Sequence, residues 1–149
     1  MLPVSNEAAR FSSFTPPPAQ APASANGTIG RANLDGTSVN QSLISGANAP
    51  LGIAVGGGYV FWANYAFGNY TIGRANLDGT AANVSFLSAN GPYGIAADAQ
   101  HVYWANASGV GVARANLDGT GADQSWILAN APLGVAVDGA HVYWAKPRR

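Results

Sequence analysis

The sequence contains no cysteine. This absence excludes disulfides, thiolate nucleophiles and thiolate metal sites together. Charge is also scarce, because Asp, Glu, Lys and Arg make up 9% of the chain, against about 25% in typical soluble domains. Seven basic residues balance seven acidic ones, so no net field attracts nucleic acid or an anionic membrane. We therefore expect no nucleic-acid binding.

Long apolar runs and a leader are missing as well. No apolar stretch approaches the roughly eighteen residues of a membrane span, so we expect no membrane insertion. Met1–Arg10 lacks the basic region followed by an apolar region that marks a secretory signal peptide. Glu7 is the only Glu, and the chain shows no Ser/His/Asp order, glycine-rich phosphate loop or paired carboxylates. We assign no catalytic residue and no cofactor.

The most informative feature is the heptapeptide Arg-Ala-Asn-Leu-Asp-Gly-Thr, which occurs unchanged at 31–37, 74–80 and 114–120. A spacing of about forty residues, with turn signals between the copies, is typical of β-propeller blades. Gly and Pro recur every few residues, and no window keeps an apolar period of 3.6 residues for the length of a helix. The sequence therefore predicts an all-β repeat protein.

Each repeat begins with two predicted strands that form a hairpin. A Pro-x-Gly-apolar-Ala segment opens the first strand, where a proline removes no needed hydrogen bond. An aromatic and β-branched segment ending in tryptophan follows, a composition that favours a second strand. The first strands are predicted at 50–54, 92–96 and 132–136. The second strands are predicted at 59–62, 101–104 and 141–144.

Two more strands complete the repeat. The third leads into the heptapeptide and ends at Asp-Gly, a strong hairpin signal because Gly tolerates positive φ and Asp bonds its own backbone. Third strands are predicted at 28–34, 71–77 and 110–117, and fourth strands at 40–44, 83–87 and 124–128. Four antiparallel strands in about forty residues match one propeller blade.

The chain divides into three parts by composition. Residues 1–26 are rich in Pro and Ala and predict a disordered arm. Residues 27–146 hold the blades, and residues 147–149 form a short basic tail.

The order Pro-x-Gly-Ile-Ala, then Tyr-Trp, then Arg-x-x-Leu-Asp-Gly resembles the YWTD repeat of low-density-lipoprotein-receptor-type (class B) β-propellers and their bacterial relatives. The resemblance covers residues 28–146. The namesake tetrapeptide reads Phe-Trp-Ala-Asn at 61–64, Tyr-Trp-Ala-Asn at 103–106 and Tyr-Trp-Ala-Lys at 143–146, a departure that points to a divergent bacterial copy. The resemblance implies six blades and a secreted or cell-envelope protein.

The phasing of the strands predicts an incomplete ring. The chain opens with third and fourth strands at 28–46, continues with whole blades at 50–88 and 92–128, and closes with first and second strands at 132–145. Three blades are fewer than the four to eight of known propellers, so one chain is not expected to close on itself. The unpaired N–H and C=O groups of an exposed edge strand can pair with a strand of another chain. We expect a homodimer that forms one six-bladed ring; the alternative is a fragment of a longer propeller.

Arg31, Arg74 and Arg114 occupy the same place in each repeat and would form a ring on closure. They are candidates to bind an anionic ligand. A repeated Arg more commonly joins neighbouring blades, by pairing with an Asp or by stacking on an aromatic ring such as Trp62 or Trp104.

Other repeated residues predict structural uses. The Asp of each Asp-Gly turn is expected to cap its local backbone. Large aromatic side chains are expected to fill the space between blades. Together these predicted structural residues are Asp35, Asp78, Asp118, Trp62, Trp104, Trp144, Tyr103 and Tyr143.

Tyr65, Phe67 and Tyr70 lie in the longer loop between the second and third strands of the first whole blade. Aromatic loop residues supply contact area at low entropic cost, so this loop is the best ligand-facing candidate. His101 and His141 each follow an Asp by three residues, which gives too few ligands per repeat for a zinc site. No metal site is assigned.

These observations predict a non-enzymatic propeller that binds or scaffolds a protein or a small ligand through its loops. The alternative is a propeller lyase or hydrolase whose site is completed by a second subunit or by missing blades. An enzyme would gather acidic or His side chains at the channel mouth, whereas a binding module would present an aromatic or neutral rim.

Overall fold

A computed structural model describes residues 26–109 and 111–148. These residues form twelve strands and no helix, arranged as four separate antiparallel sheets. The all-β prediction is therefore confirmed. None of the described residues belongs to a helix long and apolar enough to cross a membrane. The predicted arm at 1–26 lies outside the described residues except for Asn26, where the first strand begins.

Two sheets have four strands each, in the order in which the strands follow along the chain. The first of these blades contains β3 (Pro50–Gly56), β4 (Tyr59–Ala66), β5 (Asn69–Asn76) and β6 (Asn83–Ser88). The second contains β7 (Pro92–Ala97), β8 (His101–Asn106), β9 (Gly111–Asn116) and β10 (Asp123–Leu128). Both are the four-stranded meanders that the repeat predicted.

The other two sheets have two strands each and stand at the two ends of the chain. The N-terminal hairpin pairs β1 (Asn26–Arg31) with β2 (Asn40–Asn48). The C-terminal hairpin pairs β11 (Gly134–Val137) with β12 (Val142–Ala145). They correspond to the outer half and the inner half of a blade, as the phasing of the strands predicted.

The third strand of each repeat is shorter than the sequence suggested at its C-terminal end. The prediction carried the first of them to Leu34, but β1 ends at Arg31. The Asn33 N–H donates to the Thr37 carbonyl at 2.8 Å, and the Gly36 N–H donates to the Asn33 carbonyl at 2.9 Å. The same two bonds close the turns after β5 and β9, which nevertheless run on to Asn76 and Asn116. β5 and β9 are longer because β4 and β8 pair with them up to these residues, whereas no such inner strand pairs with β1 in the described part of the chain.

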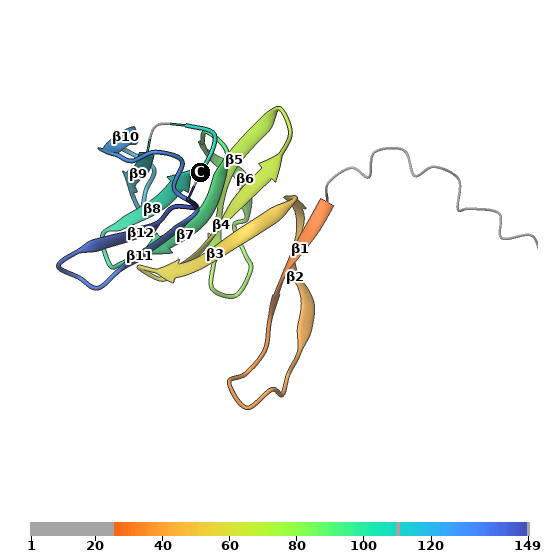
Figure 1. Cartoon of the computed structure of the whole chain (residues 1–149). Coiled ribbons are helices and arrows are strands. Elements are labelled where there is room, and N and C mark those ends of the chain that lie inside the picture. The colour runs from red at the N-terminus through yellow and green to blue at the C-terminus, as the bar shows by residue number, and fades with distance from the viewer. Residues whose placement is uncertain (1–25, 110, 149) are drawn as a thin grey trace, which may run out of the picture.

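The sheets follow one another as an open arc (Figure 1). The first strands of consecutive sheets lie side by side, β3 against β7 and β7 against β11. The β1–β2 hairpin stands at one end of the arc, and the β11–β12 hairpin stands at the other.

The core lies between consecutive blades. Trp62 packs with Ile29 and Ile44 of the N-terminal hairpin, and Trp104 packs with Phe61 and Ile72 of the preceding blade. Both indole rings are fully buried. Their Nε1–H groups have no hydrogen-bond partner among the residues that the structure describes, so the packing must outweigh a cost of about 1–3 kcal/mol for each unpaired donor.

Candidate binding site

The repeated arginines join each blade to the next. Arg31 Nη1 donates to the Leu77 carbonyl at 2.8 Å, and Arg74 Nη1 donates to the Leu117 carbonyl at 2.7 Å. In both cases the acceptor belongs to the heptapeptide of the following blade. These two guanidinium groups are therefore held between blades.

Arg74 and Arg114 stack on rings other than those expected. The Arg74 guanidinium lies 4.6 Å from the Tyr59 ring centroid and 4.1 Å from that of Phe86, and Arg114 lies 4.5 Å from the Trp126 ring. Trp62 and Trp104 are not the stacking partners, because they are buried in the clusters between blades. Trp126, the residue that departs from Leu43 and Phe86 in the repeat, thus covers the last arginine.

The Asp of each heptapeptide binds its own turn. Asp35 Oδ1 accepts from the Thr37 hydroxyl at 2.6 Å and from the Thr37 N–H at 2.9 Å. The Asp78–Thr80 and Asp118–Thr120 pairs repeat both bonds. The threonine hydroxyl, followed by the backbone N–H, holds the pKa of each of these carboxyl groups below its usual value.

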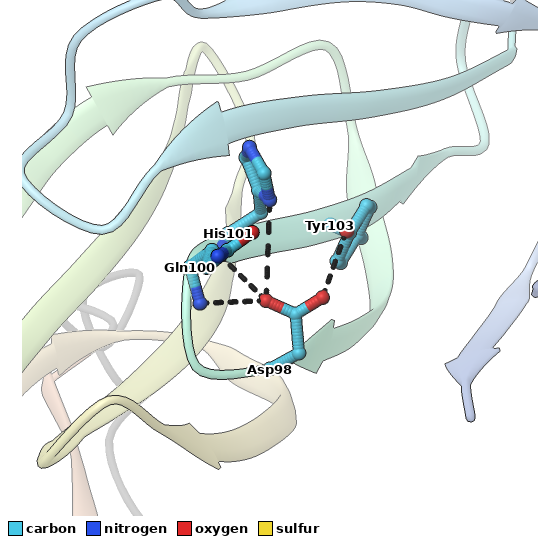
Figure 2. A network of polar contacts seen from close by, with 4 residues as sticks. All are labelled: Asp98, Gln100, His101 and Tyr103. Carbon is cyan, nitrogen blue, oxygen red and sulfur yellow. Dashed lines mark hydrogen bonds and ion pairs between the residues drawn. The ribbon is translucent and has the colours of Figure 1, made fainter. Parts of the chain in front are cut away.

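A second type of turn centres on Asp98 (Figure 2). Asp98 Oδ1 accepts from the Gln100 and His101 N–H groups at 2.8 and 2.7 Å, and Oδ2 accepts from the Tyr103 hydroxyl at 2.9 Å. Burial acts to raise the pKa of Asp98, but the three hydrogen bonds and His101 together lower it. Burial and the bond to Asp98 raise the pKa of Tyr103 to about 12.

The C-terminal hairpin repeats this arrangement in a more exposed form. Asp138 accepts from the Ala140 and His141 N–H groups and from the Tyr143 hydroxyl. The Ala140 N–H, the Tyr143 hydroxyl and the His141 N–H lower the pKa of Asp138 to about 2. Among the described residues, no group of three or more His, Cys, Asp or Glu could hold a metal ion. The Asp and His pairs serve as turns.

Two buried asparagines follow the buried tryptophans and were not predicted to have a role. Asn64 Oδ1 accepts from the Asn48 N–H of the preceding sheet at 3.0 Å, while its Nδ2 donates to Thr71 and to the Val84 carbonyl. Asn106 likewise accepts from the Asn90 N–H and donates to the Gln124 carbonyl. Their recurrence at the fourth position of the tetrapeptide was the available signal.

The prediction of a long ligand-facing loop was wrong, because β4 runs on to Ala66 and β5 begins at Asn69, so that Tyr65 and Tyr70 form a cross-strand pair and only Phe67 lies in the turn. The two tyrosines contribute to an aromatic cluster that spans two blades. The Tyr65 and Tyr70 ring centroids lie 5.0 Å apart, and those of Tyr65 and Tyr93 lie 4.8 Å apart. Phe67, in the β4–β5 turn beside them, is 98% exposed. We call Tyr65, Phe67, Tyr70 and Tyr93 the aromatic rim.

Sequence reasoning missed Tyr93. It occupies the middle position of the Pro-x-Gly segment, where the other repeats carry Leu51 and Leu133. That departure from the repeat was the only signal, and it did not reveal which blade Tyr93 would contact. The cluster raises the pKa of Tyr70, through loss of water and the neighbouring Tyr65.

Comparison with known proteins places the fold. No family model and no curated protein sequence matches this chain. Among solved structures, a chain in the crystal structure of a nidogen/laminin complex is similar, with a TM-score of 0.64 and 22% sequence identity. The similarity covers 81% of this chain and 50% of the other, so this protein spans about half the length of that neighbour. The neighbour is a β-propeller, and the chain has the blades and the curvature of a β-propeller fold.

Proposed function

We propose that this chain is a non-enzymatic binding module that recognises a protein partner through the aromatic rim. The observation that carries the proposal is the rim itself, in which Tyr65 contacts both Tyr70 and Tyr93 and the neighbouring Phe67 is almost fully exposed.

The chemistry of the rim favours a protein surface as ligand. Tyr and Phe are enriched at the centres of protein interfaces, since each ring buries a large area and loses few rotamers. The tyrosine hydroxyls add hydrogen-bonding groups to an otherwise apolar surface. Charged residues are scarce throughout the chain, so apolar contact and neutral hydrogen bonds are expected to dominate.

The tyrosines of the rim stand on strands of two blades, and sites built on strands are positioned more precisely than sites on loops. Tyr65 and Tyr70 are paired across β4 and β5, while Tyr93 comes from β7 of the next blade. In this proposal the chain acts as half of a six-bladed ring, closed by a second copy or by further blades of a longer chain. The nidogen/laminin neighbour, of which the matched part covers 50%, supports that division.

A peptide-display selection against the immobilised chain tests the rim. We expect enriched peptides whose affinity falls at least tenfold, about 1.4 kcal/mol, in Phe67→Ser and in Tyr93→Ser. The matched control is Val39→Ser, which removes another exposed apolar side chain from the β1–β2 loop and should leave affinity unchanged. Failure to enrich any peptide, or equal binding to the Phe67 and Val39 variants, would contradict the proposal.

A further inference from the structure

The two ends of the arc have unmatched strand edges. Among the described residues, β1 is bonded only to β2, and β12 is bonded only to β11. In the two whole blades the equivalents of β12 and β1, namely β4 with β5 and β8 with β9, are hydrogen-bonded neighbours. Within the described residues, the C-terminal hairpin is thus not paired with the outer half of a blade, and the N-terminal hairpin is not paired with an inner half.

A recurring contact shows how one blade seats on the next. The heptapeptide of each blade accepts a hydrogen bond from the Arg of the blade before, as Leu77 does from Arg31 and Leu117 from Arg74. The turn glycine also rests against the outer strand of the preceding blade. A Cβ on Gly119 would lie 3.0 Å from Phe86 Cζ, and one on Gly79 would lie 2.7 Å from the Leu43 carbonyl oxygen.

The donor side of this contact, the Arg, and its acceptor side, the heptapeptide turn, each occur once more in the described chain without the other. Arg114 and Trp126, with Asp98 and Tyr103, line a hollow beside the C-terminal hairpin, and no heptapeptide follows there in the described chain. At the other end, the Leu34 side chain is fully exposed. No atom of the described residues lies within 4 Å of the Cβ position of Gly36, so this turn does not pack against a preceding blade as the turns at Gly79 and Gly119 do.

The strands β12 and β1 also carry residues that lack the contact made by their equivalents on β4 and β5. Trp62 lies directly over Gly73, where a Cβ would come within 2.1 Å of the indole. Gly30 occupies the same position in the N-terminal hairpin, yet the nearest atom to its Cβ position is the Asn40 carbonyl oxygen at 3.1 Å. Conversely, Trp144 is 43% exposed, whereas Trp62 and Trp104 are 0% exposed. The C-terminal hairpin therefore exposes a tryptophan that is buried in the whole blades. The N-terminal hairpin exposes the glycine position against which such a tryptophan packs.

The first strands show the same imbalance. Ile53 on β3 is 54% exposed, whereas its equivalent Ile95 on β7 is 7% exposed. Ile95 is covered by the preceding blade, where a Cβ on Gly52 would lie 3.2 Å from its side chain. The equivalent glycine at the far end of the chain, Gly134, would place a Cβ near no atom closer than Ala145 at 3.8 Å.

We infer that a second copy of this chain closes the arc, with β12 of each copy pairing with β1 of the other. The register of β4 with β5 sets Trp144 opposite Gly30, and Lys146 opposite Thr28, of the other copy. Arg114 then donates to the Leu34 carbonyl of the other copy. A two-fold axis satisfies both ends at once, and two whole blades and two halves from each copy make six blades.

A second copy is the occupant that these surfaces favour, because the exposed Trp144 and the Arg114 hollow at one end have their complements, Gly30 and the 31–37 heptapeptide, at the other end of the same chain. The heptapeptide at 31–37 is identical to the two that already accept an Arg. The unpaired strand edges also continue the antiparallel ladders already present within each hairpin. This inference deepens the proposed function by naming the partner that completes the ring.

The absence of native cysteine permits a register-specific test. Asn64 and Thr71 face each other across β4 and β5, with Nδ2 and Oγ1 3.0 Å apart, and Lys146 and Thr28 hold the same two positions. The double variant Lys146→Cys/Thr28→Cys should oxidise to a covalent dimer on a non-reducing gel. Each single variant should stay monomeric on that gel.

An out-of-register control, Lys146→Cys/Ala32→Cys, moves the second thiol by four residues, about 13 Å along the strand, beyond the reach of a disulfide. It should not cross-link. Equal cross-linking of both double variants, an intramolecular disulfide, or free thiols in folded in-register protein would overturn the inference. The gel reads assembly alone, so its failure is distinct from failure of the peptide selection.

Hydrogen exchange of the unmodified chain keeps the inference testable if the variants do not fold. Backbone amides of β1 and β12 should be protected at high protein concentration and lose protection on dilution. Exchange at the rate of free edge strands at every concentration would overturn the inference.

Discussion

The second whole blade and the C-terminal hairpin share a sequence but differ in their surroundings. Both contain His-Val-Tyr-Trp-Ala, at 101–105 and 141–145, and both form the same Asp-capped hairpin. Yet Tyr103 is buried while Tyr143 is 53% exposed, and the tryptophans differ in the same way. Local sequence thus determines the hairpin, whereas the strands that follow it determine what is buried.

The largest effect should come from the tryptophans. Trp104→Ala should lower the free energy of unfolding by about 3–5 kcal/mol, the usual cost of truncating a buried aromatic residue, at every protein concentration. Trp144→Ala should instead cost stability only where the ring is assembled, since its side chain is half exposed in the single chain. Urea unfolding at two protein concentrations separates the two. A near-neutral Trp104→Ala would contradict the assignment of that residue to the core.

The buried asparagines should give the next largest effect. Asn106→Ala leaves the Asn90 N–H and the Gln124 carbonyl without their partner, and should cost about 1–3 kcal/mol of stability. Lys146→Ala changes the equivalent, exposed position of the C-terminal hairpin and should shift the stability of the dilute chain by less than about 0.5 kcal/mol. Thermal or urea unfolding measures both losses. If Asn106→Ala and Lys146→Ala lowered the free energy of unfolding equally, the whole blade and the half blade would not differ at this position.

The arginines extend the comparison to the contacts between blades. Arg74→Met removes the bond to the Leu117 carbonyl and the stacking on Tyr59 and Phe86, and should destabilise the chain by about 1–2 kcal/mol. Arg114→Met should destabilise the dilute chain less, but should weaken association between copies. Unfolding and sedimentation of the same two variants measure these two quantities. If Arg114→Met left association unchanged, the proposed contact with Leu34 would be wrong.

The smallest effect should be the acid response of the C-terminal hairpin. The pKa of Asp138 is lowered from 3.8 to about 2, so its hydrogen bonds contribute stability that is present above pH 4 and lost as the pH falls towards 2. Asp138→Asn should remove this part of the acid dependence, and the effect is small because the carboxylate is exposed to solvent. Carboxyl chemical shifts followed by NMR between pH 5 and pH 1.5 provide the measurement. An Asp138 that titrates near 4 would contradict the turn as described.

The sequence was sufficient to predict the blades but not their contacts. Repeated Asp-Gly turns and tryptophan-ending segments specify short strands locally, so the order of twelve strands followed from spacing. The end of β1 at Arg31 did not, because β1 has no inner neighbour among the described residues, whereas β4 pairs with β5 as far as Asn76. The acceptors of the arginines are backbone carbonyls, which are identical in every residue and leave no mark in the sequence.

The sequence predicted the part of the aromatic rim that lies within one blade but not the contact between blades. Tyr65 and Tyr70 face each other across one hairpin, a relation that strand pairing alone can suggest. Tyr93 joins them from another blade, which depends on how the blades stack. The homodimer and the rim as a binding surface remain predictions.

Sedimentation equilibrium of the unmodified chain tests the central claim most directly, namely that the two half blades are complementary parts of one ring. The chain has a mass of 15.1 kDa, and the account predicts a species of twice that mass with the circular dichroism of β-strands. A folded species that keeps its strands and stays at 15.1 kDa at high concentration would contradict it.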